Sequence, residues 1–161
     1  MRRNALQLSR RHKAALYFFT LLLLATGLAW WGLDRWAAVP DEFGGLAKHP
    51  AQPWMLRLHG AGAFGFLLVF GSLIPGHIHR GWHMRQNRAT GLILVAVFSI
   101  LSLTGYALYY LGEESGRAFA SAAHWWIGLA SPLLLIAHVV RGHWLRRHGR
   151  LRRRDALQPE E

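Results

Sequence analysis

Four long apolar blocks constrain the possible folds of this chain more than any other feature of its sequence. Each block is about twenty residues long, and a helix of that length spans about 30 Å, the thickness of a bilayer's hydrocarbon core. A soluble four-helix bundle would show polar faces at helical spacing, and residues 15–24 (ALYFFTLLLL) show no such face. We therefore predict an all-α integral membrane four-helix bundle. The predicted helices cover residues 14–33, 54–75, 89–111 and 118–140.

The chain of 161 residues has the length of one domain, and we predict a single transmembrane domain that ends in a basic tail, residues 141–161. The first apolar block follows several basic residues, as the apolar region of a secretory signal does. However, it is too long for such a region, and no small-residue cleavage site closes it. Trp30 and Trp31 near its end are typical of interfacial anchors, so we predict a retained helix.

The net charge of +11 is distributed unevenly along the chain. All of the 19 Lys and Arg residues except Arg35, Lys48, Arg57 and Arg117 lie before the first predicted helix, between the second and third, or after the fourth. Cytoplasmic segments of membrane proteins are enriched in these residues, so both termini are predicted to face the cytoplasm. The charge then reflects topology and contact with membrane lipid, and we do not predict nucleic-acid binding. Because the chain has no cysteine, disulfides, cysteine-ligated iron–sulfur clusters and covalently attached c-type haem are excluded.

Ten histidines are many for this length, and three of them lie inside predicted membrane helices. An ionisable side chain in a membrane helix is energetically costly, so it indicates a functional site. His124 and His138 in the fourth helix are fourteen residues apart, which places both on one face and about 21 Å apart along the axis. His59 enters the second helix at the depth of His124. These positions are typical of two stacked haems that share the fourth helix, and they favour His59 with His124 as the outer pair.

Two histidines compete as the inner partner of His138. His12 lies just before the first apolar block, on the same predicted side of the membrane. His77 lies eighteen residues after His59, or five helical turns, so it shares the face of His59. However, Pro75 is predicted to end the helix before His77, and the axial rise would be about 27 Å. We favour His12 and keep His77 as the alternative. The remaining histidines are predicted to be surface residues: His49, His79, His83, His143 and His148.

Small and cationic residues near the predicted ligands are consistent with a haem site. Gly60, Gly62 and Gly65 near His59 would let a flat macrocycle approach the helix, and close helix packing is an equally good explanation of them. Arginines at the helix ends are candidates to pair with haem propionates. These are Arg57 and Arg117 on the outer side, and Arg10, Arg11 and Arg141 on the inner side.

Several segments taken together resemble the bacterial cytochrome b-561 family, whose members are small four-helix di-haem proteins of the inner membrane. The matching segments are residues 9–12 (SRRH), 58–62 (LHGAG), 103–110 (LTGYALYY), 124–128 (HWWIG) and 136–138 (IAH). The resemblance implies that the first and second helices give one ligand each and that the fourth helix gives two. Carried over to this chain, it pairs His59 with His124 at an outer haem b, and His12 with His138 at an inner haem b.

The resemblance also implies electron transfer across or within the bilayer, with quinone as donor or acceptor and with a redox partner protein. Members of the family are linked to superoxide oxidation with quinone reduction, and related haem subunits serve membrane-bound oxidoreductases, so the choice between enzyme and conduit stays open. The alternative is a histidine-based metal or proton transporter or sensor without haem, which would need carboxylates inside the helices, and the predicted helices have none. A structural protein without a cofactor would leave the spacing of the histidines unexplained.

Overall fold

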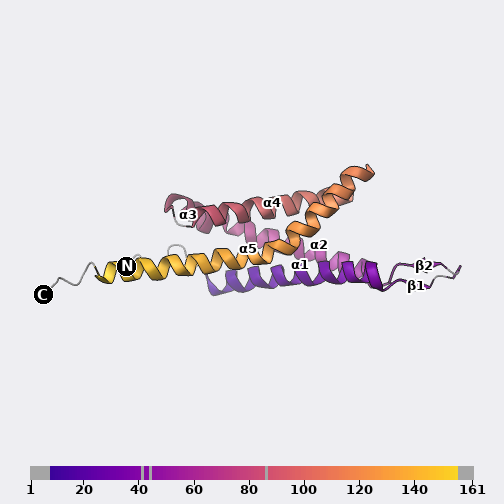
Figure 1. Ribbon diagram of the computed structural model, residues 1–161, viewed down its shortest axis with the longest axis horizontal. Helices are drawn as coiled ribbons and strands as arrows, with labels where there is room; N and C mark the ends of the chain where they lie inside the picture. The colour runs from indigo at the N-terminus through magenta and orange to yellow at the C-terminus, as the bar shows by residue number, and fades with distance from the viewer. Residues whose placement is uncertain (1–7, 41, 44, 86, 156–161) are drawn as a thin grey trace. The chain divides into compact units, whose positions relative to one another are not determined.

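The computed structural model describes residues 8–40, 42–43, 45–85 and 87–155, with side chains described as far as residue 149 (Figure 1). Contacts divide the chain into two compact units. The N-terminal unit extends to His77, and the C-terminal unit begins at Ile78. The regular structure of the described residues is helical apart from one pair of two-residue strands, which confirms the predicted all-α class.

The N-terminal unit consists of helix α1 (Arg10–Trp36) packed against helix α2 (Gln52–Ser72). Helix α1 begins four residues before the predicted start, because the Ser9 hydroxyl accepts a hydrogen bond from the backbone N–H of His12 at 3.2 Å and caps the first turn. His12 therefore lies within the first turn of α1. Its position is set by this N-terminal cap.

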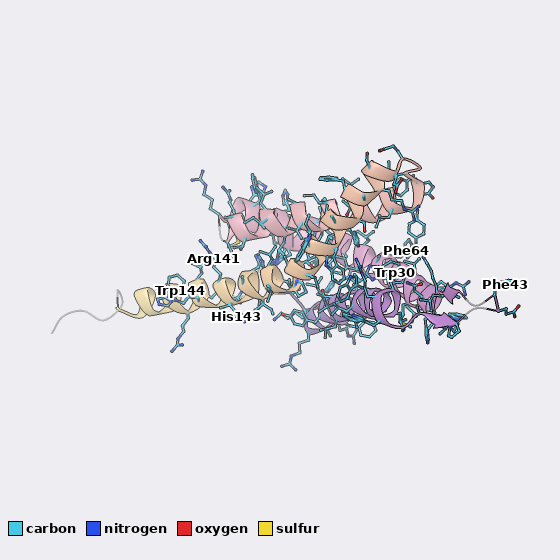
Figure 2. The ribbon with its side chains drawn as sticks, turned by 45° about the vertical axis from the view of Figure 1, so that its right-hand side comes forward. Trp30, Phe43, Phe64, Arg141, His143 and Trp144 are labelled. Carbon is cyan, nitrogen blue, oxygen red and sulfur yellow. The ribbon has the colours of Figure 1, made fainter. Side chains whose placement is uncertain are left out.

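The connection between α1 and α2 contains a short hairpin. Strand β1 (Val39–Pro40) pairs antiparallel with strand β2 (Leu46–Ala47), with Val39 opposite Ala47. Phe43 lies between the two strands with 95% of its surface exposed (Figure 2). The hairpin extends beyond the ends of the two helices (Figure 1).

Helical conformation continues beyond α2, where the sequence pattern predicted a break. A π-helical turn η1 (Ile74–Ile78) follows α2 and leads directly into α3 (His79–His83). The backbone N–H of His77 donates to the carbonyl of Leu73 at 2.9 Å. Proline lacks an N–H and its ring crowds the preceding turn, and a π-helical turn is one of the ways in which a helix absorbs such a disturbance. His77 therefore lies in a helical turn rather than in a loop.

The C-terminal unit consists of α3, α4 (Arg88–Tyr110) and α5 (Glu114–Asp155), with α4 packed against α5. Helix α5 continues fifteen residues past the predicted end at residue 140, because this part of the chain is rich in Arg, which is a good helix former. Figure 2 shows Arg141, His143 and Trp144 on this continuation. Residues 156–161 of the predicted tail lie outside the described residues.

Helix α5 contains Pro132 in its interior, where proline leaves the carbonyl four residues earlier without its usual donor. That carbonyl belongs to Gly128, and the Ser131 hydroxyl donates a hydrogen bond to it at 2.9 Å. Helix α5 bends in this part of the chain (Figure 1), as helices commonly do at proline. The bend lies between His124 and His138.

Most apolar side chains face outward in both units. Phe64 on α2 and Leu103 on α4 are each 68% exposed, whereas the small core of each helix pair holds residues such as Phe66 and Phe98. Among the described residues, four helices are long and apolar enough to cross a membrane, and at most 17% of each apolar window is buried. Outward apolar surface of this kind is typical of a multi-pass membrane protein, in which lipid covers it. The four spans are Arg10–Trp36, Gln52–His83, Arg88–Tyr110 and Glu114–Gly149.

Candidate functional site

His59 on α2 lies against a threonine and a glycine that are adjacent in α1. Its Nδ1 lies 3.0 Å from Oγ1 of Thr26, which is only 5% exposed. The same hydroxyl lies 2.7 Å from the carbonyl oxygen of Leu22. A Cβ added to Gly27 would lie 3.4 Å from Cε1 of His59, so the glycine leaves room for the ring. We call a threonine and the following glycine that contact a histidine ring in this way a Thr–Gly pair.

A second Thr–Gly pair holds His124 in the C-terminal unit. Nδ1 of His124 on α5 lies 3.0 Å from Oγ1 of Thr104 on α4. The Thr104 hydroxyl lies 2.8 Å from the carbonyl oxygen of Ile100, again four residues earlier in the same helix. A Cβ added to Gly105 would lie 3.3 Å from Cε1 of the His124 ring. The arrangement therefore repeats that of His59 with different residues and in the other unit.

A third Thr–Gly pair holds His138, near the start of α4. Nδ1 of His138 lies 2.8 Å from Oγ1 of Thr90, and a Cβ added to Gly91 would lie 3.6 Å from its Cε1. Here the threonine hydroxyl lies 2.7 Å from Oδ1 of Asn87 rather than close to a helical carbonyl. The Asn87 amide nitrogen in turn donates to the backbone carbonyl of His138 at 3.0 Å.

The Thr–Gly pairs assign the tautomer of all three imidazoles. Carbonyl and amide oxygens only accept hydrogen bonds, so each threonine gives its single hydroxyl proton to the oxygen 2.7–2.8 Å away. The hydroxyl oxygen can then only accept from the histidine, which must carry its proton on Nδ1. In this tautomer Nε2 holds the lone pair, and it is the nitrogen with which the ring would bind a metal. These imidazoles could therefore offer Nε2 to a metal ion or to a metal-containing cofactor.

The spacing of the histidines in α5 matches that of the threonines in α4. Thr90 and Thr104 are fourteen residues apart, as are His124 and His138, and the two helices run antiparallel. Both histidines therefore lie on the face of α5 that packs against α4, as their spacing predicts. Fourteen residues correspond to about 21 Å of helix, so this unit holds one imidazole at each of two positions along the helix axis, which we call levels.

The N-terminal unit also has histidines at two levels. His59 lies opposite Thr26, and His12 lies fourteen residues before Thr26 in α1, again about 21 Å away along the axis. His12 is exposed, and its Nδ1 lies 2.8 Å from the Ser9 hydroxyl. That hydroxyl also accepts from the backbone N–H of His12. No carbonyl or amide oxygen of the described residues accepts its proton, so the contact does not assign a tautomer to His12. His77, the alternative, is partly buried in η1.

The glycines near His59 differ in what surrounds them. A Cβ on Gly65 would lie 2.4 Å from the ring of Phe19, and one on Gly62 would lie 3.1 Å from Leu22. These two glycines therefore allow α1 and α2 to pack closely. A Cβ on Gly60 would meet nothing within 4 Å, so this glycine plays no part in that packing.

The predicted propionate partners Arg57, Arg117 and Arg141 are exposed, and Arg141 lies in the interior of α5 rather than at the helix end that the sequence predicted. Arg57 is two residues before His59, and its guanidinium lies 4.7 Å from the centre of the Trp54 ring. Arg117 lies in the first turns of α5, and Arg141 lies one turn beyond His138. Their exposure leaves the guanidinium groups accessible to an anionic ligand.

The turn before α5 is organised by Glu113. Its carboxylate accepts hydrogen bonds from the Ser115 hydroxyl, from the backbone N–H of Gly116 at 2.8 Å and from that of Ser115 at 3.0 Å. These bonds, the Ser115 hydroxyl first, lower the pKa of Glu113 below its ordinary value of 4.5. Glu113 thus caps the N-terminus of the helix that carries His124 and His138.

Comparison with known proteins gives no match: no family model, no curated protein and no solved structure is similar to this chain. Among the described residues, no group of three or more His, Asp or Glu side chains is arranged to hold a metal ion. The residues of the site that sequence reasoning missed are Thr26, Thr90 and Asn87, and Thr104 was noted only as part of a matching segment. One signal was present, because three of the four threonines in the chain are followed by glycine, all three in apolar blocks.

Proposed function

We propose that this protein is a di-haem b-type membrane cytochrome that transfers electrons across or within the bilayer, to or from quinone. The proposal includes a four-helix bundle in the bacterial inner membrane with both termini in the cytoplasm, following the distribution of Lys and Arg. One haem b would be held by His59 and His124, and the other by His138 and His12, with His77 as the alternative to His12.

The observation that carries the proposal is the three Thr–Gly pairs. Metal-binding histidines commonly donate the N–H of the second ring nitrogen to an oxygen acceptor, which fixes the tautomer and the direction of the ring. His59, His124 and His138 each have this arrangement, in helices long and apolar enough to cross a membrane. If these three histidines served only to pack helices, they would not need to share the same tautomer.

The levels of the histidines support two sites rather than one. In each unit, the two candidate ligands are about 21 Å apart along the direction of the helix axes, so a single haem cannot use both. When bound, haem b supplies an iron that takes up and releases one electron. The chain's own residues orient the imidazoles through the threonine hydroxyls, and Arg57, Arg117 and Arg141 would offer positive charge to the propionates.

A haem count tests the proposal directly. The protein is purified from cells supplied with haem, and the reduced-minus-oxidised absorption spectrum is recorded with the haem content per chain. We expect b-type bands and two haems per chain. His49→Ala is the matched control, because His49 accepts a hydrogen bond from Ala51 within the loop before α2, and this variant should retain both haems. Absence of b-type bands would refute the proposal and favour a haem-free transporter or sensor.

The electron partner needs a separate measurement. Protein in vesicles is mixed with a quinol, or exposed to superoxide, and the reduced b-type bands are followed with time. Reduction by quinol supports exchange with quinone in the bilayer. Reduction by superoxide followed by reduction of added quinone would support superoxide oxidase-like activity, and failure of both donors would point to electron exchange with a redox partner protein.

A further inference from the structure

We propose that Asn87 is a positioning residue for His138, because its side-chain oxygen replaces the helical carbonyl that the other two Thr–Gly pairs use. The tautomer of His138 depends on this oxygen. The proposal rests on the proposed function only for the role of His138 as a haem ligand, since the tautomer itself is a property of the protein without haem.

The need for Asn87 follows from the place of Thr90 in its helix. Thr26 and Thr104 lie in helix interiors, where the carbonyl four residues earlier accepts their hydroxyl proton. Thr90 is the third residue of α4, so no residue of this helix lies four positions before it. Its hydroxyl lies 3.4 Å from the backbone carbonyl of Asn87 but only 2.7 Å from Oδ1 of the same residue. The side chain therefore provides the better acceptor.

Two contacts orient the Asn87 amide. Its nitrogen lies 3.0 Å from the carbonyl oxygen of His138, which can only accept a hydrogen bond, so the nitrogen must point there and Oδ1 must point to Thr90. The amide nitrogen also lies 3.3 Å from Nδ1 of His138, a longer contact than the 2.8 Å between Nδ1 and the Thr90 hydroxyl. The shorter contact is the hydrogen bond that Nδ1–H donates.

The backbone at this position also favours asparagine. Asn87 precedes α4 with φ of 54° and ψ of 31°, in the left-handed region that few residues other than glycine and asparagine adopt readily. A Cβ added to Gly142 on α5 would lie 3.6 Å from the Asn87 amide nitrogen, so the two residues face each other closely. Asn87 thus meets both the conformational and the hydrogen-bonding demands of the site.

Two substitutions separate these roles. Asn87→Gly keeps the left-handed backbone accessible but removes the side-chain acceptor, which leaves only the more distant backbone carbonyl at 3.4 Å. The Thr90 hydroxyl then becomes able to donate its proton to Nδ1 of His138. The ring would then carry its own proton on Nε2, the nitrogen that binds metal. Asn87→Asp keeps an oxygen acceptor for Thr90 and should preserve the wild-type tautomer.

The test is ¹⁵N NMR of the full-length, histidine-labelled protein without haem, in phosphatidylcholine vesicles at about pH 8, where an ordinary imidazole is neutral. The His138 signals are identified by their loss in His138→Ala. We expect the Nδ1–H tautomer in wild type and Asn87→Asp, and a shift toward Nε2–H in Asn87→Gly. An unchanged His138 tautomer in Asn87→Gly would overturn the proposal. Thr104→Val is the matched control, which should alter the signals of His124 and leave those of His138 unchanged.

Haem retention gives a second, independent result. In haem-loaded protein, Asn87→Gly should weaken retention of one of the two haems by about 10- to 100-fold, as loss of a residue that orients a metal ligand typically does, and Asn87→Asp should retain it. If Asn87→Gly changes the tautomer but neither wild type nor any variant binds haem, the proposed function fails and the role of Asn87 stands. If wild type binds two haems and the tautomer in Asn87→Gly is unchanged, the role of Asn87 fails alone.

Discussion

The two units hold their candidate ligands differently. In the C-terminal unit, His124 and His138 lie on one helix, and each contacts a Thr–Gly pair on its neighbour. Among the described residues of the N-terminal unit, only His59 has such a contact, while His12 is exposed in the first turn of α1 beside Ser9. The comparison teaches that one antiparallel helix pair can hold two histidine rings at two depths, because its threonines and histidines repeat with the same spacing. In the N-terminal unit, contacts between helices hold the ring of His59, whereas His12 contacts only the cap of its own helix.

The largest expected effect is loss of a haem from either end of the C-terminal unit. His124→Ala should reduce the haem content from two to one per chain and leave the inner signal in place. His138→Ala should do the converse, because the two histidines are about 21 Å apart along α5. The measurement is the haem count with a redox titration of each variant. Retention of both haems in His124→Ala would contradict the proposed pairing with His59.

A comparison of His12→Ala with His77→Ala tests the weaker level of the N-terminal unit. We expect His12→Ala to lose one haem and His77→Ala to keep both, measured by the same haem count. His12 lies in the first turn of α1, about 21 Å along the helix axis from the depth of His59, which is the separation that a second haem site requires. The opposite result would assign the inner site to His77 and to the π-helical turn that carries it.

Thr104→Val removes the hydroxyl that accepts from His124 while keeping the shape of the side chain. We expect retention of the outer haem to weaken by about 10- to 100-fold, measured by transfer of haem to an acceptor protein. Thr20→Val is the matched control, since the Thr20 hydroxyl donates only to the Leu16 carbonyl in the contacts described and faces no histidine. Equal effects of the two substitutions would show that the Thr104 hydroxyl has no special role.

Gly65→Ala tests the packing of the N-terminal unit apart from its ligands. The added Cβ would lie 2.4 Å from the Phe19 ring, so the ring or the helices must move. We expect destabilisation of about 1–3 kcal/mol, as is typical of overpacking, measured by thermal unfolding in detergent. Gly71→Ala in the same helix is the control, because its Cβ meets nothing within 4 Å and should cause no loss of stability.

The smallest effect is expected at the cap of α5. The pKa of Glu113 is lower in the folded protein, so its stabilising contribution is present above the ordinary value of 4.5 and is lost as the pH falls through the folded value. Glu113→Gln should therefore lower Tm slightly at neutral pH, by at most about 2 °C, and the difference from wild type should vanish in acid. A difference that persists at low pH would show that charge is not the cause.

Much of the fold was predictable because length and apolar composition are local properties. Each of the four candidate spans overlaps one of the four predicted helices, since a continuous apolar segment of this length has few other stable conformations. The ends were less predictable. Ser9 caps α1 earlier than expected, a π-helical turn continues the helix past Pro75, and an Arg-rich segment extends α5. Each end depends on hydrogen bonds or turn geometry that an apolar pattern does not encode.

The site divides in the same way. The sequence by itself determined which histidines lie in apolar helices and that His124 and His138 share a face, because helical periodicity follows from chain geometry alone. Only the tertiary structure decided that Thr26, Thr104 and Thr90 face His59, His124 and His138, because a hydrogen bond between helices depends on which faces pack and in what register. The tertiary structure also determines which nitrogen of each imidazole is protonated, because this depends on the acceptor to which the neighbouring hydroxyl donates its single proton.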